Sequence, residues 1–559
     1  MVDRILTAGA VITMDDTMPR ADAVAVSGDT IVAVGTLEQC QAALPGAEVV
    51  DTGAAVLAPG FIDPHSHPLA SGSATQAPAH SIAPWDAQSW DDALKIFHTA
   101  LAESAPGTPL VFAGFDALLL EHPAPTATEL DEIFGDRIVG ILDNSGHAVY
   151  FTSATIRDHG WDATPPADPV GGRFGRNPDG SLNGQAFEIP AGFQVLIPIM
   201  QAQGGNPLVQ AADYYAWMAR NGITSTSDMT YEDDYRPAYE ALASLPSTPL
   251  RISMWQMSTT ENFAAPVEFA AGEKLLVKRG VKLWTDGSPW VGNIGISFPY
   301  LHTHATDIGG IDGSKAGVVA LNYTRAEVDA LLDTAAPLGW SMSFHANGDM
   351  AIDFALDAYE RALSLHGLMG TDHRWRLEHV GAGRADQFER AARLGVHISM
   401  GPFQYYYWGD LLDGQMFDSE YGSRWQNFRG AFDSGAVVSF HNDGAVSPPT
   451  PILNMQTAIS RKTQRGNVHR PELVATVHEA MQAQTINAAK TMHRDGLVGS
   501  IAVGKLADFV ELSADPYAVD PHSLNDQVSV VGTWLGGERI DLDAFLGAAA
   551  AIPAPGTSA

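Results

Sequence analysis

The chain of 559 residues and 59.4 kDa is too long for one small core, so its length predicts a large catalytic domain with additions. Its 65 acidic and 32 basic residues give a net charge of −33, which argues against nucleic acid and anionic membranes as partners. No apolar stretch is long enough to span a bilayer, and no secretory signal is visible. The single Cys40 cannot form an intrachain disulfide, in agreement with a reducing compartment. We therefore expect a cytoplasmic globular protein.

Both ends of the chain are rich in short β patterns. Apolar, β-branched runs separated by turns occupy residues 4–34, and similar runs return over residues 508–535 before the turn Gly536-Gly537. These patterns predict one small β-sandwich domain formed jointly by residues 1–56 and 500–546. The remaining residues 547–559 are mostly Ala, Pro, Gly and Ser, and are expected to form a disordered tail.

Between the two ends, short β runs alternate with helical patterns, which is typical of βα units around a parallel sheet. The β runs fall at residues 55–62, 223–229, 250–257, 281–284, 341–345, 374–380, 396–400 and 437–441. Eight such strands predict an α/β fold with a (β/α)8 TIM barrel over residues 57–499. The gap after the first run is too long for one crossover, so residues 68–205 are expected to form an inserted subdomain over the strand ends.

The first β run leads into the tripeptide His65-Ser66-His67. Residues two apart in a strand project to the same side, so both imidazoles can reach one metal ion. An isolated His-X-His is more often a polar loop. Here the apolar run and Pro59-Gly60 place the pair where a strand meets a loop, which favours metal ligation.

Polar residues recur at the ends of later β runs, where barrel enzymes place their chemistry. The fourth run carries Lys282 and is followed by Asp286, the fifth ends in His345, the sixth reaches His379, and Asp443 follows the eighth. A single histidine behind an apolar run is usually an ordinary strand-end residue. Independent structural histidines have no reason to repeat at equivalent strand ends, so the recurrence indicates one shared centre.

These motifs resemble the amidohydrolase superfamily, specifically the amidohydrolase-3 branch that includes N-substituted formamide deformylases. The matching motifs are PGFIDPHSHP (59–68), GVKLWTDGS (280–288), HANGDMAID (345–353), RLEH (376–379) and HNDGA (441–445). The resemblance covers nearly the whole chain and implies a metal-dependent hydrolase on a distorted barrel, with a β-sandwich built from the two ends. After Asp286-Gly287-Ser288 the chain departs from the family pattern, which should affect substrate contacts more than metal binding, so the deformylases' substrate is not assumed for it.

The resemblance also implies a set of metal ligands. The set is His65, His67, Lys282, His345, His379 and Asp443. Lys282 matches a lysine that is carboxylated in many relatives and bridges two metals, because an ammonium is a poor ligand and a carbamate is a good one. The alternative for Lys282 is an ordinary salt bridge, for instance with Asp286. The implied cofactor is one or two divalent metal ions, with zinc favoured.

The implied reaction is hydrolysis of a carbon–nitrogen bond by a metal-activated hydroxide. In this reaction Asp443 acts as general base and later as general acid, while the metal held partly by His345 and His379 polarises the substrate carbonyl. Glu378 is expected to point to the face opposite its neighbour His379 and to be structural. Asp349 is expected to cap a helix that begins near residue 350.

Four residues are predicted substrate contacts: His147, Trp290, Tyr406 and Trp408. His147 lies in a family-like Asn-Ser-Gly-His element, and a loop histidine is the equal alternative. The aromatic run at residues 405–408 follows the seventh β run, and four consecutive aromatic side chains cannot all face one core, which favours the lining of an apolar pocket over core packing.

Three functions stay open at this point. A metal-dependent amide hydrolase is favoured. A deaminase, a cyclic-amide hydrolase or an esterase could use the same metal site, and a non-catalytic barrel protein would be expected to lack ligands that this sequence retains. The expected partners are a small-molecule substrate and, by analogy alone, a second copy of the chain in a homodimer.

Overall fold

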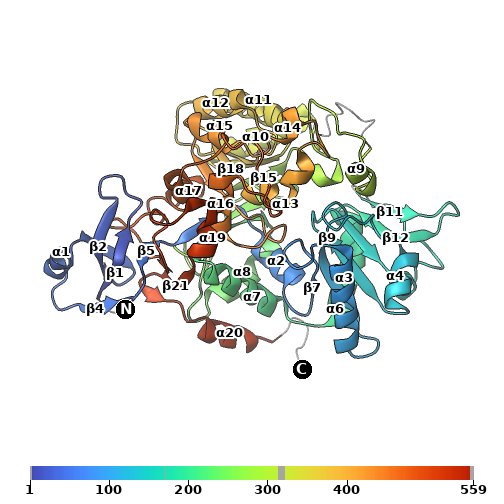
Figure 1. The fold of residues 1–559 in the computed structure, drawn as a ribbon, viewed down its shortest axis with the longest axis horizontal. Coiled ribbons are helices and arrows are strands. Elements are labelled where there is room, and N and C mark those ends of the chain that lie inside the picture. The colour runs from blue at the N-terminus through green and yellow to red at the C-terminus, as the bar shows by residue number, and fades with distance from the viewer. Residues whose placement is uncertain (1–2, 170–171, 313–320, 554–559) are drawn as a thin grey trace.

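A parallel eight-stranded barrel lies at the centre of the computed structural model, which describes residues 3–169, 172–312 and 321–553 (Figure 1). Its strands, in spatial and chain order, are β6 (Phe61–Asp63), β13 (Ile223–Tyr231), β14 (Arg251–Met257), β15 (Leu276–Trp284), β16 (Ser341–Ala346), β17 (Arg376–His379), β18 (His397–Met400) and β19 (Val438–Phe440). All neighbouring pairs are parallel. The strands are almost wholly buried, because helices cover the outside and side chains fill the interior. The barrel predicted from the apolar runs is confirmed.

Helices lie between the barrel strands and after the last one, and several of them pack against the outer face of the sheet. They are α7 (Pro207–Arg220), α8 (Arg236–Ala243), α9 (His304–Ile308), α10 (Arg325–Ala335), α11 (Asp349–Leu365), α12 (Ala385–Leu394), α13 (Pro402–Leu412), α14 (Ser419–Gly422), α15 (Phe428–Asp433), α16 (Pro451–Ser460), α17 (Val477–Ala483) and α18 (Ile486–Thr491). In α10, a capping box between Thr324 and Glu327 satisfies the first backbone N–H groups, and Val328 and Leu332 enter the core. The main core cluster joins such helix residues to the barrel strands.

The barrel has a seam between its two end strands, β6 and β19, which side-chain contacts bridge. The buried Asp63 carboxylate accepts hydrogen bonds from the backbone N–H of Asn442 at 3.3 Å and from its side-chain Nδ2 at 3.2 Å. The backbone N–H of Asp443 donates to the carbonyl of His65 at 3.1 Å. These bonds hold the residues after β19 beside the residues after β6, so distant parts of the chain meet at one mouth of the barrel.

Strands from both termini form a second, eight-stranded sheet on one side of the barrel (Figure 1). Its members are β1 (Arg4–Ile12), β2 (Arg20–Ser27), β3 (Thr30–Gly35), β4 (Glu48–Asp51), β5 (Val56–Pro59), β20 (Phe509–Leu512), β21 (Val530–Leu535) and β22 (Glu538–Arg539). A short helix, α1 (Leu37–Ala43), packs on β2 and β3.

The apolar run at residues 55–62 is two strands, where the sequence suggested one. Its first half, β5, pairs with β20 in the terminal sheet, and its second half, β6, pairs with β13 in the barrel. The break falls at Gly60, where an added Cβ would lie 2.2 Å from the Oγ1 of Thr224. Only a residue without a Cβ lets the chain pass from one sheet to the other this close to β13.

A third sheet, with six strands, lies between β6 and β13 in the chain and on the opposite side of the barrel from the terminal sheet (Figure 1). Its strands are β7 (His80–Ser81), β8 (Leu110–Phe115), β9 (Val139–Asp143), β10 (Ala148–Phe151), β11 (Arg173–Arg176) and β12 (Leu182–Phe187). The helices of this segment are α2 (Pro68–Thr75), α3 (Trp90–Glu103), α4 (Ala127–Phe134), α5 (Ser153–Asp158) and α6 (Ile189–Gln203). Its own apolar clusters give this inserted segment a core separate from the barrel core.

The C-terminal segment ends in two helices, α19 (Leu524–Gln527) and α20 (Leu542–Ala550). Helix α20 therefore covers residues 547–550, where the composition suggested disorder, and residues 554–559 lie outside the described residues. Among the helices of the described ranges, none combines the length and the apolar character needed to cross a bilayer.

Candidate metal centre

His65 and His67 follow β6 and point toward the mouth of the barrel. His65 is fully buried, whereas 18% of the His67 side chain is exposed. The Nδ1 atom of His67 lies 3.0 Å from the Oγ1 of Thr230 at the end of β13, which fixes the orientation of the ring. The predicted pair is thus held by the two adjacent strands β6 and β13.

Asp443 completes a group of three donors with this pair. Its Oδ1 lies 3.4 Å from the Nε2 of His65 and 3.3 Å from the Nε2 of His67. Metal–ligand bonds of about 2.0–2.1 Å in a tetrahedral site separate neighbouring ligand atoms by about 3.3–3.4 Å. Both distances from Asp443 match that separation, and the ligand atoms of the three residues all lie within 4.8 Å of one another. Burial raises the pKa of the Asp443 carboxyl, but the adjacent imidazoles of His65 and His67 outweigh this and hold it well below its usual value.

Lys282 projects from β15 into the same centre. Its Nζ lies 3.1 Å from the Nε2 of His65, and burial lowers the pKa of its amine to about 8. The salt bridge considered with Asp286 is absent, because that carboxylate accepts backbone N–H groups of other residues. These residues are Gly295, Asn347 and Gly348. About one tenth of this amine is therefore neutral at pH 7, far more than for an ordinary lysine, and it is in contact with an expected metal ligand.

His345 and His379 lie on the neighbouring strands β16 and β17, with ring centroids 4.3 Å apart. The Nε2–H of His345 donates to the carbonyl of Gly287 at 2.9 Å, which leaves Nδ1 as the atom with a free lone pair. The Nε2 of His379 is buried and has no hydrogen-bond partner among the described residues. Burial lowers the pKa of His345 to about 3 and that of His379 well below its usual value, so both rings are neutral. Neutral imidazoles with free lone pairs fit a metal-ligand role.

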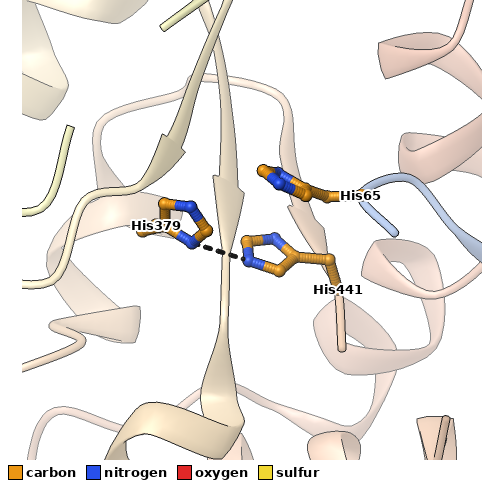
Figure 2. A group of neighbouring side chains, drawn as sticks. All are labelled: His65, His379 and His441. Atoms are coloured by element: carbon orange, nitrogen blue, oxygen red, sulfur yellow. Dashed lines mark hydrogen bonds between the residues drawn. The ribbon is translucent and has the colours of Figure 1, made fainter. Parts of the chain in front are cut away.

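A fourth buried histidine, His441, belongs to the centre and was not identified from the sequence (Figure 2). Its Nε2 lies 3.1 Å from the Nδ1 of His379, and its ring is stacked 4.8 Å from that of His65. Within the described ranges, two groups of ligand atoms lie close enough to hold an ion: His65, His67 and Asp443, and His65, His379 and His441. His441 precedes Asp443 by two residues, the same spacing that singles out His65 and His67, so the sequence did contain a signal.

Glu378 is directed into the barrel, so the expectation that it points to the face away from the centre is wrong. Its Oε2 lies 2.7 Å from the Nδ1 of His65, its Oε1 accepts from the Oγ of Ser343 at 2.7 Å, and it forms a buried ion pair with Arg376. Burial alone would raise the pKa of Glu378, but the charges of Arg376 and Lys282 hold it at about 2. Glu378 is therefore an ionised acceptor that fixes the ring of His65.

The four predicted substrate contacts lie in two places. Trp290 and Trp408 stack face to face with centroids 3.9 Å apart, and the Nε1 of the fully buried Trp408 donates to the carboxylate of Asp116 in the inserted segment at 2.9 Å. Tyr406 is half-buried on the same helix, α13, which packs against the cluster that contains both tryptophans.

His147 lies on the inserted segment, with its Nδ1 2.8 Å from the Oε2 of Glu188. Contact of these four side chains with a substrate stays a prediction.

Asp349 differs from its predicted role as a helix cap. It is the first residue of α11, whose N-cap is Gly348 without a side-chain cap. Its carboxylate accepts hydrogen bonds from the backbone N–H and the Oγ of Ser297 and pairs with Arg384. Asp349 thus ties the loop after β15 to α11 and α12.

Known proteins resemble this chain in sequence over most of its length. A family model described as the amidohydrolase family matches residues 48–541, and a model described as an imidazolonepropionase-like composite domain of bacteria matches residues 23–47. The N-substituted formamide deformylase of Arthrobacter pascens is 28% identical over 567 aligned residues, which cover 96% of this chain and 98% of that protein. Protein LONG AFTER FAR-RED 3 of Arabidopsis thaliana is 25% identical, with coverage of 97% and 92%.

Solved structures share the fold. An uncharacterized metal-dependent hydrolase from Pyrococcus horikoshii OT3 superposes with a TM-score of 0.70 at 20% identity, over 93% of this chain and 99% of that one. Atrazine chlorohydrolase from Arthrobacter aurescens TC1, in complex with zinc, superposes with a TM-score of 0.51 at 14% identity, over 98% of this chain and 99% of that one. Both comparisons extend over the barrel and the two additional sheets.

Proposed function

We propose, starting from the fact that this chain belongs to the amidohydrolase family and is a hydrolase of carbon–nitrogen bonds, that it cleaves an amide or N-acyl bond of a small molecule. The observation that carries the proposal is the position of the Oδ1 of Asp443, 3.4 Å and 3.3 Å from the Nε2 atoms of His65 and His67. A carboxylate placed this way can both complete a metal site and act on a water molecule bound beside it.

The residues present fit a divalent metal ion. His65, His67 and Asp443 would hold one ion, and the orphaned Nε2 of His379 with the Nδ1 of His345 would serve a second. Such an ion lowers the pKa of a water molecule toward neutrality and polarises a substrate carbonyl. We propose zinc, because imidazole nitrogens with one carboxylate suit it and a protein of the same fold was crystallised with zinc.

Asp443 moves the protons in the proposed reaction. Because its pKa lies well below the usual value, it is ionised at neutral pH and can accept a proton from the attacking water. The same carboxyl then donates that proton to the leaving nitrogen, which must be protonated for the carbon–nitrogen bond to break as an amine.

Lys282 contributes through its chemistry as an amine. A neutral amine can add carbon dioxide and release a proton to form an anionic carbamate, and the pKa of about 8 leaves about one tenth of the amine neutral at pH 7. We propose this modification because an ammonium ion 3.1 Å from the Nε2 of His65 would repel a metal, whereas a carbamate oxygen would bind one.

The proposal is tested by metal analysis and by a substrate panel of N-formyl amines, N-acyl amines, cyclic amides, esters and aminated rings. We expect at least one tightly bound ion per chain and release of an amine from an N-acyl substrate. Less than one ion per chain, or turnover confined to esters or aminated rings, would contradict the proposal.

Asp443→Asn tests the proton-transfer role. We expect this variant to keep its fold and most of its metal while turnover falls about 10²- to 10⁴-fold, the range for loss of a general base. The matched control is Asp333→Asn, the same substitution on α10, where the carboxylate pairs with Arg361 far from the centre. Turnover of Asp443→Asn equal to that of the control would refute the role.

A further inference from the structure

The contact between His379 and His441 joins two imidazoles in a place without solvent. Both rings are fully buried, and the Nδ1 of His379 lies 3.1 Å from the Nε2 of His441 (Figure 2). Burial away from solvent disfavours the charged form of an imidazole, and a histidine that binds a metal does so as the neutral ring. A neutral imidazole has one N–H and one lone pair, so one ring must donate this hydrogen bond and the other must accept it.

The surroundings decide which ring donates. The second nitrogen of His441, Nδ1, lies 2.9 Å from the Oγ of Ser399 on β18. The second nitrogen of His379, Nε2, is buried without a partner among the described residues. If His441 donated, His379 would bear its own N–H on that orphaned Nε2, where a buried donor without an acceptor costs about 1–3 kcal/mol. If His379 donates through Nδ1, its Nε2 instead presents a free lone pair to the centre.

We propose that His441 is a positioning residue that accepts the Nδ1–H of His379 and thereby fixes His379 in the tautomer whose Nε2 binds metal, an inference that rests on the proposed function. The chain of contacts runs from the Nε2 of His379 through its Nδ1–H to the Nε2 of His441. It continues from the Nδ1–H of His441 to the hydroxyl of Ser399. Every polar atom of the two rings then has a partner once a metal is bound.

His441 is better placed for this role than for direct ligation. Both of its nitrogens already have partners, whereas His379 has an orphaned one. The acceptor is also chemically unlike that of His65, whose Nδ1 faces the ionised carboxylate of Glu378. The Nδ1 of His65 therefore faces an anion at hydrogen-bond distance, whereas the Nδ1 of His379 contacts a neutral ring, with the Oδ2 of Asp443 3.9 Å away.

The direct test is neutron diffraction from crystals of the metal-loaded, full-length protein. We expect deuterium on the Nδ1 of His379 and on the Nδ1 of His441, none on the Nε2 of either ring, and the metal bonded to the Nε2 of His379. Deuterium on the Nε2 of His441, or a metal at about 2.0–2.1 Å from that atom, would overturn the proposal.

Variants at position 441 give a second measurement, in which metal affinity is read by competition with a chelator. We expect His441→Phe, which keeps a ring but offers no acceptor, to weaken metal binding about 10- to 100-fold. His441→Gln offers a carbonyl acceptor and should recover most of that loss. His397→Phe is the matched control, because it replaces another buried histidine on the neighbouring strand β18 without contact to the centre.

Each outcome has a separate meaning. Wild-type affinity in His441→Phe, or equal loss in the Phe and Gln variants, would overturn the positioning role while leaving the proposed function intact. A wild-type protein that binds no metal would instead overturn the proposed function, and this inference with it. If His441→Phe fails to fold, the neutron structure of the wild-type protein still decides the question.

Discussion

Glu378→Gln removes one negative charge from beneath the metal centre while nearly preserving the shape of the side chain. In the wild-type protein, this fully buried carboxylate pairs with Arg376 and accepts a hydrogen bond from the Nδ1–H of His65. In the variant, the guanidinium of Arg376 would be a buried cation without its counter-charge, and the new amide N–H₂ would face the N–H donors. We therefore expect a loss of both stability and metal affinity.

The magnitude follows from the pKa of Glu378, which is held at about 2 against an ordinary value of 4.5. Each pKa unit corresponds to about 1.4 kcal/mol, so the surroundings favour the charged form by about 3 kcal/mol. This agrees with the 3–5 kcal/mol that is lost when one partner of a buried ion pair is removed. Loss of the anionic acceptor of His65 should in addition weaken metal binding about 10- to 100-fold.

Urea unfolding of the metal-free protein measures the first effect, and competition with a chelator measures the second. The matched control is Glu511→Gln on β20, a buried carboxylate that pairs with Arg539 in the terminal sheet, remote from the centre. The control should lose stability but keep its metal affinity. Metal affinity in Glu378→Gln equal to that of the control would refute the reasoning that Glu378 orients His65.

Three further predictions concern other parts of the molecule. Removal of metal with a chelator should abolish turnover, and added zinc should restore it. Zinc at 100 times its dissociation constant should also stabilise the folded protein by about 2.7 kcal/mol in thermal unfolding, and an unchanged melting temperature would contradict the metal site. Burial lowers the pKa of His397 from 6.5 to about 3, so below pH 6.5 the unfolded chain binds more protons than the folded one and the free energy of unfolding falls. At pH 5 the loss from this residue is about 2 kcal/mol, and His397→Gln should abolish it in unfolding titrations. A variant with the same pH profile as the wild-type protein would refute this prediction. Gly60→Ala should destabilise the protein by about 1–3 kcal/mol because its Cβ meets Thr224. Thr224→Ala, which removes the two nearest atoms but keeps the Cβ, should relieve part of that loss in a double mutant, and purely additive effects would exclude the clash.

The barrel strands could be predicted because a parallel strand buried on both faces is a continuous apolar run. The run at 223–229 is a clear case, since it lies within β13. The run at 55–62 could not be divided from its pattern, because both halves are buried and apolar although they belong to different sheets. Only the contact of Gly60 with Thr224 marks the transition, and that contact is tertiary.

The errors at the site have a local cause. Strict alternation would place Glu378 and His379 on opposite faces, but His379 has a φ of 71° and Val380 a φ of 45°, so the chain leaves extended geometry there. Both side chains then serve one centre. The expected ligand pattern selected Asp443 and passed over His441, although the two share a spacing of two residues.

The aromatic run and the C-terminal tail show the limits of composition. Residues 405–408 lie on α13, and a helix distributes consecutive side chains around its axis, so Tyr405 and Trp408 are both fully buried. The alanines at residues 548–550 extend α20, since alanine is the strongest helix former when a neighbouring residue such as Phe545 anchors the helix in the core.

The direct passage from β5 into β6 has a consequence for biosynthesis. The strand that pairs with β5 along its full length, β20, is translated near the end of the chain. During translation, the segment that delivers His65 and His67 therefore has one flank unpaired until the ribosome has released the last sheet strands. We therefore expect the strand that leads to His65 and His67 to gain its full pairing only after β20 has been synthesised.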